Sequence, residues 1–406
     1  MPLSNPPRCG TLHAMRSLYV HIPYCRSKCR YCGFNSVPAG DDTVLESYTR
    51  ALVAEIRGAG AGKYDSFSDT VYFGGGTPSL LSLHQLGGIM AALRGLAPLP
   101  AGAELSIECN PETLDAEKLA GLRQLGFDRL SLGVQSFDDD LLALMGRPHD
   151  AARAAESFSL ARAAGFANVG IDLIFALPGQ TLDGFRRDLE RAIALGPEHL
   201  SLYALTYEKN SEFGTLKTEG KLIPANEDLE TDMYLAAIEA LAAAGYQHYE
   251  VSNFARQGFR SRHNLNYWDC GEYLGFGAGA HSHVAGKRRA NDPDPAAYVR
   301  KIDAKQDPRT FEETLTRDQQ LFEAVFLGLR MTGGIDVAAF AARWGGPPWS
   351  RSPREWQRLE REGLVVREPG RVRLSQRGLL LADGVLARLA PDPSFHNEQL
   401  SMNNEQ

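Results

Sequence analysis

The chain has 406 residues, 43% of them hydrophobic and 23% charged, and a formal net charge of −7. These values are typical of a soluble globular protein with more than one domain, and the negative charge argues against a chain-wide surface for nucleic acid. No apolar run approaches the ~20 residues that would span a bilayer.

Both ends of the chain are expected to lie outside the folded part. Residues 1–14 lack the apolar core of a signal peptide, so they are interpreted as an unstructured extension of a cytoplasmic protein. Residues 392–406 are polar and are expected to form a disordered tail.

Six short β-rich runs alternate with helical patterns in the first part of the chain. The runs are residues 17–22, 69–74, 104–109, 129–134, 168–175 and 199–205. Two of the helical stretches between them, 114–126 and 182–196, end in glycine, which suits a left-handed helix C-cap. Repeated strand–helix–strand units indicate a parallel sheet. Six units fall short of a closed barrel, so the pattern predicts an α/β fold with an open, partial (β/α)6 barrel over residues 15–250.

The pattern changes in the C-terminal third. Residues 251–311 are interpreted as a connecting region that holds "HNLNYW" at 263–268. Short helices follow, then a strand–turn–strand pattern, which together predict a winged-helix-like α+β domain over residues 312–391. This region is locally basic, but scattered arginines on helix faces usually only face solvent, and no nucleic-acid partner is expected.

Three cysteines are clustered near the N-terminus. Cys25, Cys29 and Cys32 have the spacing C-x3-C-x2-C. Three kinds of site compete for this pattern. A zinc site would recruit His21 as a fourth ligand, and a structural iron–sulfur cluster would need a fourth thiolate. An open [4Fe–4S] cluster would use the three thiolates and leave one iron free for a substrate or cofactor.

Polar or glycine-rich segments lie at or near the carboxyl ends of all six predicted strands. They are the cysteine loop, "GGGTPS" at 74–79, Glu108, Gln135, Asp172 and Tyr203. Because the carboxyl ends of parallel strands meet at one edge, these groups are expected to line one site. The glycines let a backbone approach a ligand closely, and Glu108 and Asp172 can accept hydrogen bonds from an ammonium or from ribose hydroxyls. The set suits S-adenosylmethionine, which can chelate an iron through its amine and carboxylate, and so favours the open cluster.

Several motifs of the chain resemble those of a known superfamily. "CRSKCRYC" with "GGGTP" resembles the radical S-adenosylmethionine superfamily. "YVHIPYCRSKCRYC", "SIECNPE", "SLGVQSF", "GIDLIFALPGQT" and "HNLNYW" followed by "YLGFGAGAHS" resemble the oxygen-independent coproporphyrinogen III dehydrogenase group within it. The resemblance runs from about Leu18 to the winged-helix-like region.

The resemblance implies a [4Fe–4S] cluster and bound S-adenosylmethionine. It implies that the cluster ligands are Cys25, Cys29 and Cys32. The cofactor-binding residues that it implies are Tyr19, Tyr31, Gly75, Gly76, Thr77, Glu108, Gln135, Arg147, Asp172 and Ala204.

Two departures favour the haem chaperone branch of that group over the dehydrogenase. The enzyme's cluster motif continues to a fourth Cys two residues past the third, where this chain has Phe34, and the enzyme has a longer arm ahead of its cluster. We therefore expect a chaperone that binds haem as cargo and transfers it to apo-haem proteins such as respiratory cytochromes. A radical enzyme that decarboxylates coproporphyrinogen III is the alternative. A peripheral association with membranes and a homodimer are left open.

The segment "HNLNYW" is the predicted haem contact. His263 is the candidate axial ligand, because neutral imidazole suits haem iron, and Tyr267 and Trp268 offer flat apolar area. His281, His283 and Cys270 are rival ligands. The alternative for His263 is a structural hydrogen-bonding role.

Overall fold

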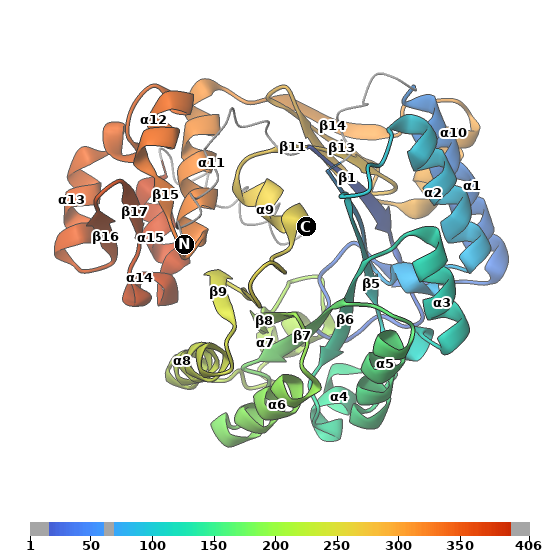
Figure 1. Cartoon of the computed structure of the whole chain (residues 1–406), viewed down its shortest axis with the longest axis horizontal. Helices are drawn as coiled ribbons and strands as arrows, with labels where there is room; N and C mark the ends of the chain where they lie inside the picture. The colour runs from blue at the N-terminus through green and yellow to red at the C-terminus, as the bar shows by residue number, and fades with distance from the viewer. Residues whose placement is uncertain (1–15, 61–68, 391–406) are drawn as a thin grey trace, which may run out of the picture.

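The computed structural model describes residues 16–60 and 69–390. The predicted extension 1–14 and the predicted tail 392–406 lie outside the described residues. The main feature is a 12-stranded sheet, which Figure 1 shows as a curved wall. Six of its strands follow one another along the chain and in space: β1 (Arg16–Ile22), β4 (Thr70–Gly75), β5 (Glu104–Cys109), β6 (Arg129–Gln135), β7 (Asn168–Phe175) and β8 (His199–Ala204).

Each of these six strands pairs in parallel with the next. The predicted strands and the predicted partial (β/α)6 barrel are therefore confirmed. Successive side chains of a strand point to opposite faces of the sheet. Phe73, Ile107 and Leu132 are fully buried in the core on one face. Neighbours such as Ser106 and Ser131 place polar groups on the other face, so the inner side of the wall is polar.

Helices cover the outer side of the wall (Figure 1). They are α1 (Asp42–Gly58), α2 (Leu83–Leu96), α3 (Ala116–Leu125), α5 (Ala151–Ala163), α6 (Leu182–Leu195) and α8 (Glu227–Ala243). The short helices α4 (Asp139–Met145) and α7 (Glu212–Thr218) follow β6 and β8. The predicted C-caps are confirmed, because Gly126 and Gly196 end their helices with φ of 101° and 71°. The segments between the strands therefore form the crossovers that parallel pairing requires.

Both edges of the sheet extend beyond the predicted strands. On one side β11 (Glu272–Phe276) pairs in parallel with β1 and is followed by antiparallel β12 (His281–Val284), β13 (Lys287–Asn291) and β14 (Arg309–Thr314). On the other side β10 (Asn253–Ala255) and β9 (Gln247–Glu250) pair antiparallel beyond β8. Residues 251–311 thus belong largely to the same sheet, with α9 (Arg262–Trp268) and α10 (Pro295–Asp303) between the strands. Strand β14 straddles the predicted boundary at 312.

A small C-terminal unit has a hydrophobic core of its own. Its elements are α11 (Arg317–Arg330), β15 (Ile335–Asp336), α12 (Val337–Trp344), α13 (Pro353–Arg361), β16 (Val365–Glu368), β17 (Arg371–Leu374), α14 (Gln376–Leu380) and α15 (Ala382–Leu389). The predicted strand–turn–strand is the antiparallel pair β16–β17. Trp356, Leu359 and Val372 lie in the core of this unit, separate from the core of the large sheet. Figure 1 shows the unit facing the inner side of the wall, with α9 between them.

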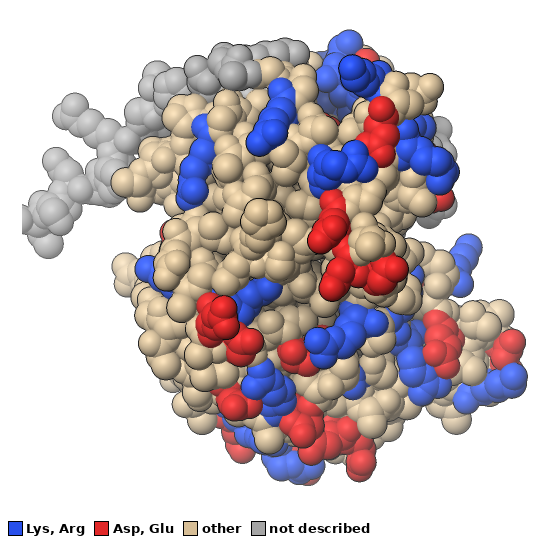
Figure 2. Space-filling view, turned by 90° about the vertical axis from the view of Figure 1, so that its right-hand side faces the viewer, with Lys and Arg blue, Asp and Glu red and all other residues tan. Residues whose placement is uncertain are grey.

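The surface carries charges of both signs. Figure 2 shows lysine and arginine interspersed with aspartate and glutamate on the side that includes α1 and α10. The ion pair Arg50–Asp303 joins these two helices, and Lys301 of α10 pairs with Asp292, which precedes that helix. None of the helices among residues 16–60 and 69–390 is long and apolar enough to cross a membrane.

Candidate functional site

The cysteine loop, residues 25–36, leaves β1 and is tied to three neighbouring segments. The amide of Thr77, after β4, donates to the carbonyl of Tyr24 at 2.8 Å. The amide of Arg30 donates to Met145 O of α4 at 3.0 Å, and Arg30 O accepts from the Phe213 amide of α7 at 2.8 Å. These backbone contacts hold the loop at the carboxyl ends of the strands.

All three cysteines of the loop are half-buried, and each sulfur lies near a polar hydrogen. The Thr77 hydroxyl donates to Cys25 Sγ at 3.4 Å, and Arg147 Nη1 donates to Cys29 Sγ at 3.4 Å. Cys32 Sγ lies 3.8 Å from the Ser36 hydroxyl. Burial raises the pKa of Cys25 to about 11 and also raises that of Cys32, so both are neutral thiols until a cation binds. A bound metal reverses this by stabilising the thiolate.

The glycines of "GGGTP" are required by the cysteine loop itself. A Cβ on Gly76 would lie 2.8 Å from Tyr24 O and 3.0 Å from Cys25 Sγ. Gly75 has φ of 112°, and a Cβ there would lie 2.6 Å from the His21 ring. The groups that approach these glycines most closely are therefore His21, Tyr24 and Cys25 of this chain, at the end of β1 and the start of the cysteine loop.

Two carboxylates face the polar inner side of the wall. Glu108 accepts hydrogen bonds from the Tyr72 hydroxyl at 2.7 Å and from the Gly75 amide at 3.2 Å. Both oxygens of Asp172 lie 3.0 Å from the Ser131 hydroxyl. Burial raises the pKa of Glu108 to about 7, and the charge of Asp172 adds to this rise. Burial also raises the pKa of Asp172. A cationic ligand beside the pair would reverse these shifts.

Of four further predicted residues, three lie at or beside the same strand ends, and Tyr19 lies in the middle of β1. Gln135 ends β6 at a register shift against β7, with φ of 69°. The Tyr19 ring stacks against Tyr72 with ring centroids 6.3 Å apart. Ala204 ends β8, and Tyr31 packs against the small cluster formed by α4 and α7. The structure thus brings the residues predicted to bind the cofactor to one end of adjacent strands.

The predicted haem contact lies at the opposite end of the strands. Helix α9 rests on Glu104, the first residue of β5, whose carboxylate accepts the backbone amides of Arg262 and His263 at 3.1 Å each. His263 Nδ1 lies 2.7 Å from the hydroxyl of Thr70, the first residue of β4, and Nε2 lies 2.8 Å from the Tyr267 hydroxyl. Figure 1 shows α9 inside the curve of the sheet. The helix therefore plugs the barrel at the amino ends of its strands.

The His263 ring is neutral and engaged on both sides. It is 1% exposed, stacks on Tyr72 at 4.9 Å, and burial lowers its pKa to about 3. Coordination of haem iron by His263 would require the Tyr267 hydroxyl to move. The geometry shown here is that of the structural hydrogen-bonding alternative. Of the rival ligands, His281 and His283 lie on β12, and Cys270 lies two residues after the end of α9.

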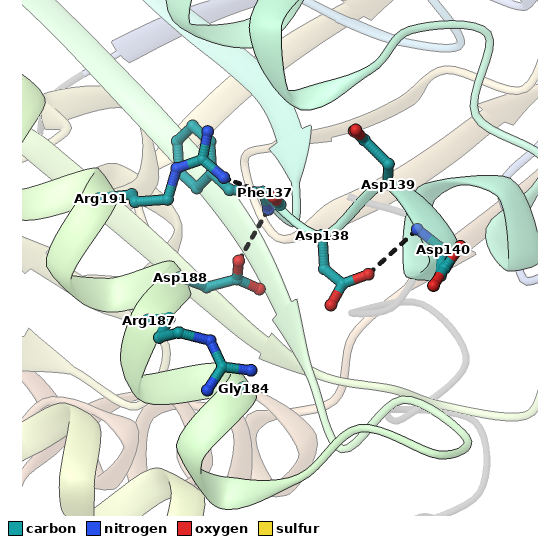
Figure 3. A pocket seen from close by; sticks show the side chains of 8 residues that line it. All are labelled: Phe137, Asp138, Asp139, Asp140, Gly184, Arg187, Asp188 and Arg191. Carbon is teal, nitrogen blue, oxygen red and sulfur yellow. Dashed lines mark hydrogen bonds between the residues drawn. The ribbon is translucent and has the colours of Figure 1, made fainter.

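A separate cavity of about 360 Å³ lies on the outer side, between α4 and α6 (Figure 3). It is lined by Phe137, Asp138, Asp139, Asp140, Gly184, Arg187, Asp188 and Arg191. Asp188 already accepts hydrogen bonds from the Ser136 hydroxyl and the Phe137 amide, at 2.7 and 2.8 Å. The cavity contains none of the predicted site residues, so the functional site is assigned to the ends of the strands.

Comparison with known proteins identifies the family of the chain. Residues 19–192 match the Radical SAM superfamily, and residues 315–381 match the HemN C-terminal domain. The chain is 38% identical to "Heme chaperone HemW" of Bacillus subtilis (strain 168) over 372 residues, which cover 91% of this chain and 98% of that relative. This chain belongs to the HemW family of radical SAM proteins.

Two further comparisons extend this result. The HemW of Lactococcus lactis subsp. lactis (strain IL1403) is 35% identical over 381 residues, covering 94% of this chain and 99% of the relative. The solved structure of coproporphyrinogen III oxidase (HemN) from Escherichia coli, described as a radical SAM enzyme, superposes with a TM-score of 0.80. It is 26% identical and covers 94% of this chain and 92% of its own. The fold of this HemW family member is therefore shared with an enzyme as well as with chaperones.

The geometry argues against the zinc alternative. His21 has both ring nitrogens engaged, Nδ1 with the Tyr19 hydroxyl at 3.0 Å and Nε2 with Asn35 O at 2.9 Å. In the described part of the chain, no three His, Cys, Asp or Glu side chains converge as a single metal ion requires. The thiolates of a four-iron cluster bind different irons and need not meet at one point. The loop therefore fits an open cluster better than one zinc ion.

Sequence reasoning missed Asn110, which lies between two predicted residues. Its Nδ2 donates to the Thr77 hydroxyl at 3.0 Å, and its Oδ1 accepts from Arg147 Nη2 at 2.6 Å. A signal was present, because Asn110 directly follows β5 in "SIECNPE", where polar residues indicate a site. Tyr72 was missed as well, and its hydroxyl fixes Glu108.

Proposed function

We propose that this chain is a cytoplasmic haem chaperone that carries an open [4Fe–4S] cluster and S-adenosylmethionine. It binds haem as cargo and transfers it to apo-haem proteins such as respiratory cytochromes. The observation that carries the proposal is the similarity to relatives named as haem chaperones, which covers 91% of this chain and 98% of the Bacillus protein.

The cluster would be held by Cys25, Cys29 and Cys32. When bound, such a cluster leaves one iron free for chelation by the amine and carboxylate of S-adenosylmethionine. Thr77 and Arg147 support this assignment, because each donates a hydrogen bond to a sulfur and so stabilises its thiolate form. The half-buried position of the sulfurs limits the access of water to the cluster.

S-adenosylmethionine would lie against the carboxyl ends of β1 and β4 to β8. Glu108 and Asp172 would accept hydrogen bonds from its ammonium or its ribose hydroxyls. A cationic ligand suits this place, since two carboxylates with raised pKa values face it. The remaining contacts proposed are Tyr19, Tyr31, Gly75, Gly76, Thr77, Gln135, Arg147 and Ala204.

Haem would be bound through the "HNLNYW" segment, with His263 as the proposed axial ligand. Trp268 is half-buried at the end of α9, where the guanidinium of Arg330 on α11 lies over its ring, 6.0 Å from the ring centroid. Binding in this way requires that Tyr267 releases His263 Nε2, because the two are hydrogen-bonded at 2.8 Å. Haem binding is therefore proposed to rearrange α9.

The alternative function is the oxidative decarboxylation of coproporphyrinogen III, favoured by the superposition on HemN. Phe34 argues against it. Where the enzyme's motif has a fourth Cys, this chain places an aromatic side chain that is 46% exposed, within the cysteine loop. This change leaves the three proposed ligands intact and alters only the surface beside them.

Anaerobic isolation followed by four assays tests the proposal. We expect iron and sulfide at the level of one [4Fe–4S] cluster, haem that is retained on gel filtration, and haem transfer to an apo-cytochrome. Incubation with reductant, S-adenosylmethionine and coproporphyrinogen III should give no decarboxylated product. Several turnovers per cluster would establish the alternative, and zinc without iron would contradict the cluster. The elution volume on the same column reports whether the chain is a homodimer.

A further inference from the structure

A continuous chain of hydrogen bonds joins two of the three clustered cysteines. The Thr77 hydroxyl donates to Cys25 Sγ at 3.4 Å, and Asn110 Nδ2 donates to Thr77 Oγ1 at 3.0 Å. Arg147 Nη2 donates to Asn110 Oδ1 at 2.6 Å, and its Nη1 donates to Cys29 Sγ at 3.4 Å. Asn110 is the central link, and it contacts neither sulfur itself.

We propose that Asn110 is a positioning residue that fixes the direction of this relay, so that Cys25 and Cys29 both receive hydrogen bonds. The inference rests on the proposed [4Fe–4S] cluster and goes beyond it, because it assigns control of the cluster's reduction potential to a residue outside the predicted ligand and cofactor contacts.

The direction follows from the donor and acceptor capacity of each group. Arg147 has only donors, so it must face the oxygen of the Asn110 amide. The NH2 group of that amide must then face Thr77, which accepts from it. A threonine hydroxyl has a single hydrogen, and this hydrogen remains available for Cys25. The Arg147 guanidinium therefore fixes the orientation of the Asn110 side-chain amide, and this amide fixes the direction in which the Thr77 hydroxyl donates.

The backbone around Asn110 keeps its side chain in place. The backbone amide of Asn110 donates to the Ser79 hydroxyl at 3.3 Å. The backbone carbonyl of Asn110 accepts from the Thr113 amide at 3.0 Å and from the Thr113 hydroxyl at 2.7 Å. Arg147 is anchored in turn, because its Nη2 also donates to Gly133 O at 2.6 Å. The relay thus rests on fixed segments that follow β4, β5 and β6.

Hydrogen bonds to the sulfurs are one of the determinants of iron–sulfur reduction potentials. A donor stabilises the more negative, reduced cluster more than the oxidised one, and so raises the potential. Loss of the bond to Cys25 should therefore shift the potential to a more negative value.

The substitution Asn110→Asp tests the relay. A carboxylate can only accept, so the Thr77 hydroxyl should turn toward it and leave Cys25. We expect a cluster with wild-type iron and sulfide content and a more negative potential, measured by an electron paramagnetic resonance redox titration without S-adenosylmethionine. Thr77→Val should shift the potential in the same direction, and the double variant should shift no further than Asn110→Asp alone. Thr77→Ser should retain the wild-type value.

Asn210→Asp is the matched control. Asn210 is exposed, and its Nδ2 donates to Gly33 O of the cysteine loop at 3.3 Å, so the variant adds the same charge near the loop without touching the relay. Its shift should be smaller than that of Asn110→Asp.

Two outcomes would overturn the inference. The first is a reduction potential that does not change in Asn110→Asp and Thr77→Val although both proteins carry intact clusters. The second is a double variant whose shift equals the sum of the two single shifts. Absence of iron and sulfide from the wild-type protein would instead overturn the proposed cluster. If Asn110→Asp does not fold, equal potentials for Thr77→Ser and Thr77→Val would still contradict the relay.

Discussion

Glu108 and Asp172 face the same polar interior, and each already accepts hydrogen bonds from the protein. Tyr72 and Ser131 aim the carboxylates, while burial raises the pKa of both and the charge of Asp172 further raises that of Glu108. Such a pair is stable when neutral or when a cation lies beside it. At the scale of single residues, the site is therefore arranged for a positively charged ligand.

The first prediction concerns the affinity for S-adenosylmethionine. Glu108→Gln and Asp172→Asn should each weaken binding by about 1.5–3 kcal/mol, because a hydrogen bond to a charged group is lost. Iron and sulfide content should not change, since neither carboxylate contacts a cysteine of the loop. Isothermal titration under anaerobic conditions measures the effect. Unchanged affinity in both variants would mean that the cofactor binds elsewhere.

A pH dependence follows from the raised pKa of Glu108. Below its pKa of about 7, Glu108 is mostly protonated in the free protein, and it attracts a cation strongly only after it loses that proton. Affinity for S-adenosylmethionine should therefore rise with pH, and below the pKa it should change by about tenfold per pH unit.

The control for this prediction is Glu108→Gln, which cannot titrate. The cofactor's own amine and the neighbouring Asp172 also titrate, so the difference between wild type and this variant isolates Glu108. Parallel pH profiles for the two proteins would contradict the assignment.

The residues of the site were predictable to different degrees. Cys25, Glu108 and Asp172 were found because polar groups after parallel strands meet at one edge. Asn110 was missed because its role depends on Thr77 and Arg147, which lie 33 and 37 positions away in the sequence. No local pattern reports such a three-way contact.

At the scale of elements, α9 is the part whose role the sequence left open. It begins at the cap Ser261 and is held by Glu104 from β5, so it is fixed to the base of the barrel. The His263 ring lies between Thr70 and Tyr267. These contacts predict that the ring stabilises the fold whether or not it also meets haem.

His263→Ala should lower the free energy of unfolding by about 2–4 kcal/mol, through the lost packing and the unpaired Tyr267 hydroxyl, whereas the Thr70 hydroxyl keeps its hydrogen bond to Ser17. Asn264→Ala is the control on the same helix and should stay within about 0.5 kcal/mol of the wild type. Urea unfolding measures both. A fully stable His263→Ala protein that no longer binds haem would favour the ligand role over the structural one.

The strands differ in how well the sequence reports them. The six parallel strands were predicted because each is a compact apolar run between helices. Strands β11 to β13 were not, because the stretch "GFGAGAHSHVAGKR" is rich in glycine and polar residues. Strand β11 is also defined by its pairing with β1, more than 250 residues earlier in the chain. Such nonlocal pairing leaves no periodic signal.

At the scale of the whole molecule, the small unit is attached to the barrel near α9. Thr332 bridges to the backbone of β9, with its hydroxyl donating to His248 O at 2.7 Å. Arg343 of α12 donates to Asp269 O at 2.8 Å and to Cys270 O at 3.0 Å. A cation at the carboxyl end of a helix also complements its dipole. The small unit therefore caps the helix that carries the proposed haem contacts.

The last prediction tests this coupling. Arg343→Ala should speed amide hydrogen exchange at the end of α9 by roughly 2- to 10-fold, the opening expected from the loss of an exposed hydrogen bond of about 0.5–1.5 kcal/mol. Exchange within β16 and β17 should not change, because the core of the small unit does not include Arg343.

Arg361→Ala on α13 is the control, since its Nε donates only within its own helix, to Gln357 O at 3.3 Å. Equal exchange at the end of α9 in both variants would show that the small unit does not stabilise this helix. If haem binding rearranges α9 as proposed, Arg343→Ala should also change the affinity for haem, whereas Arg361→Ala should not.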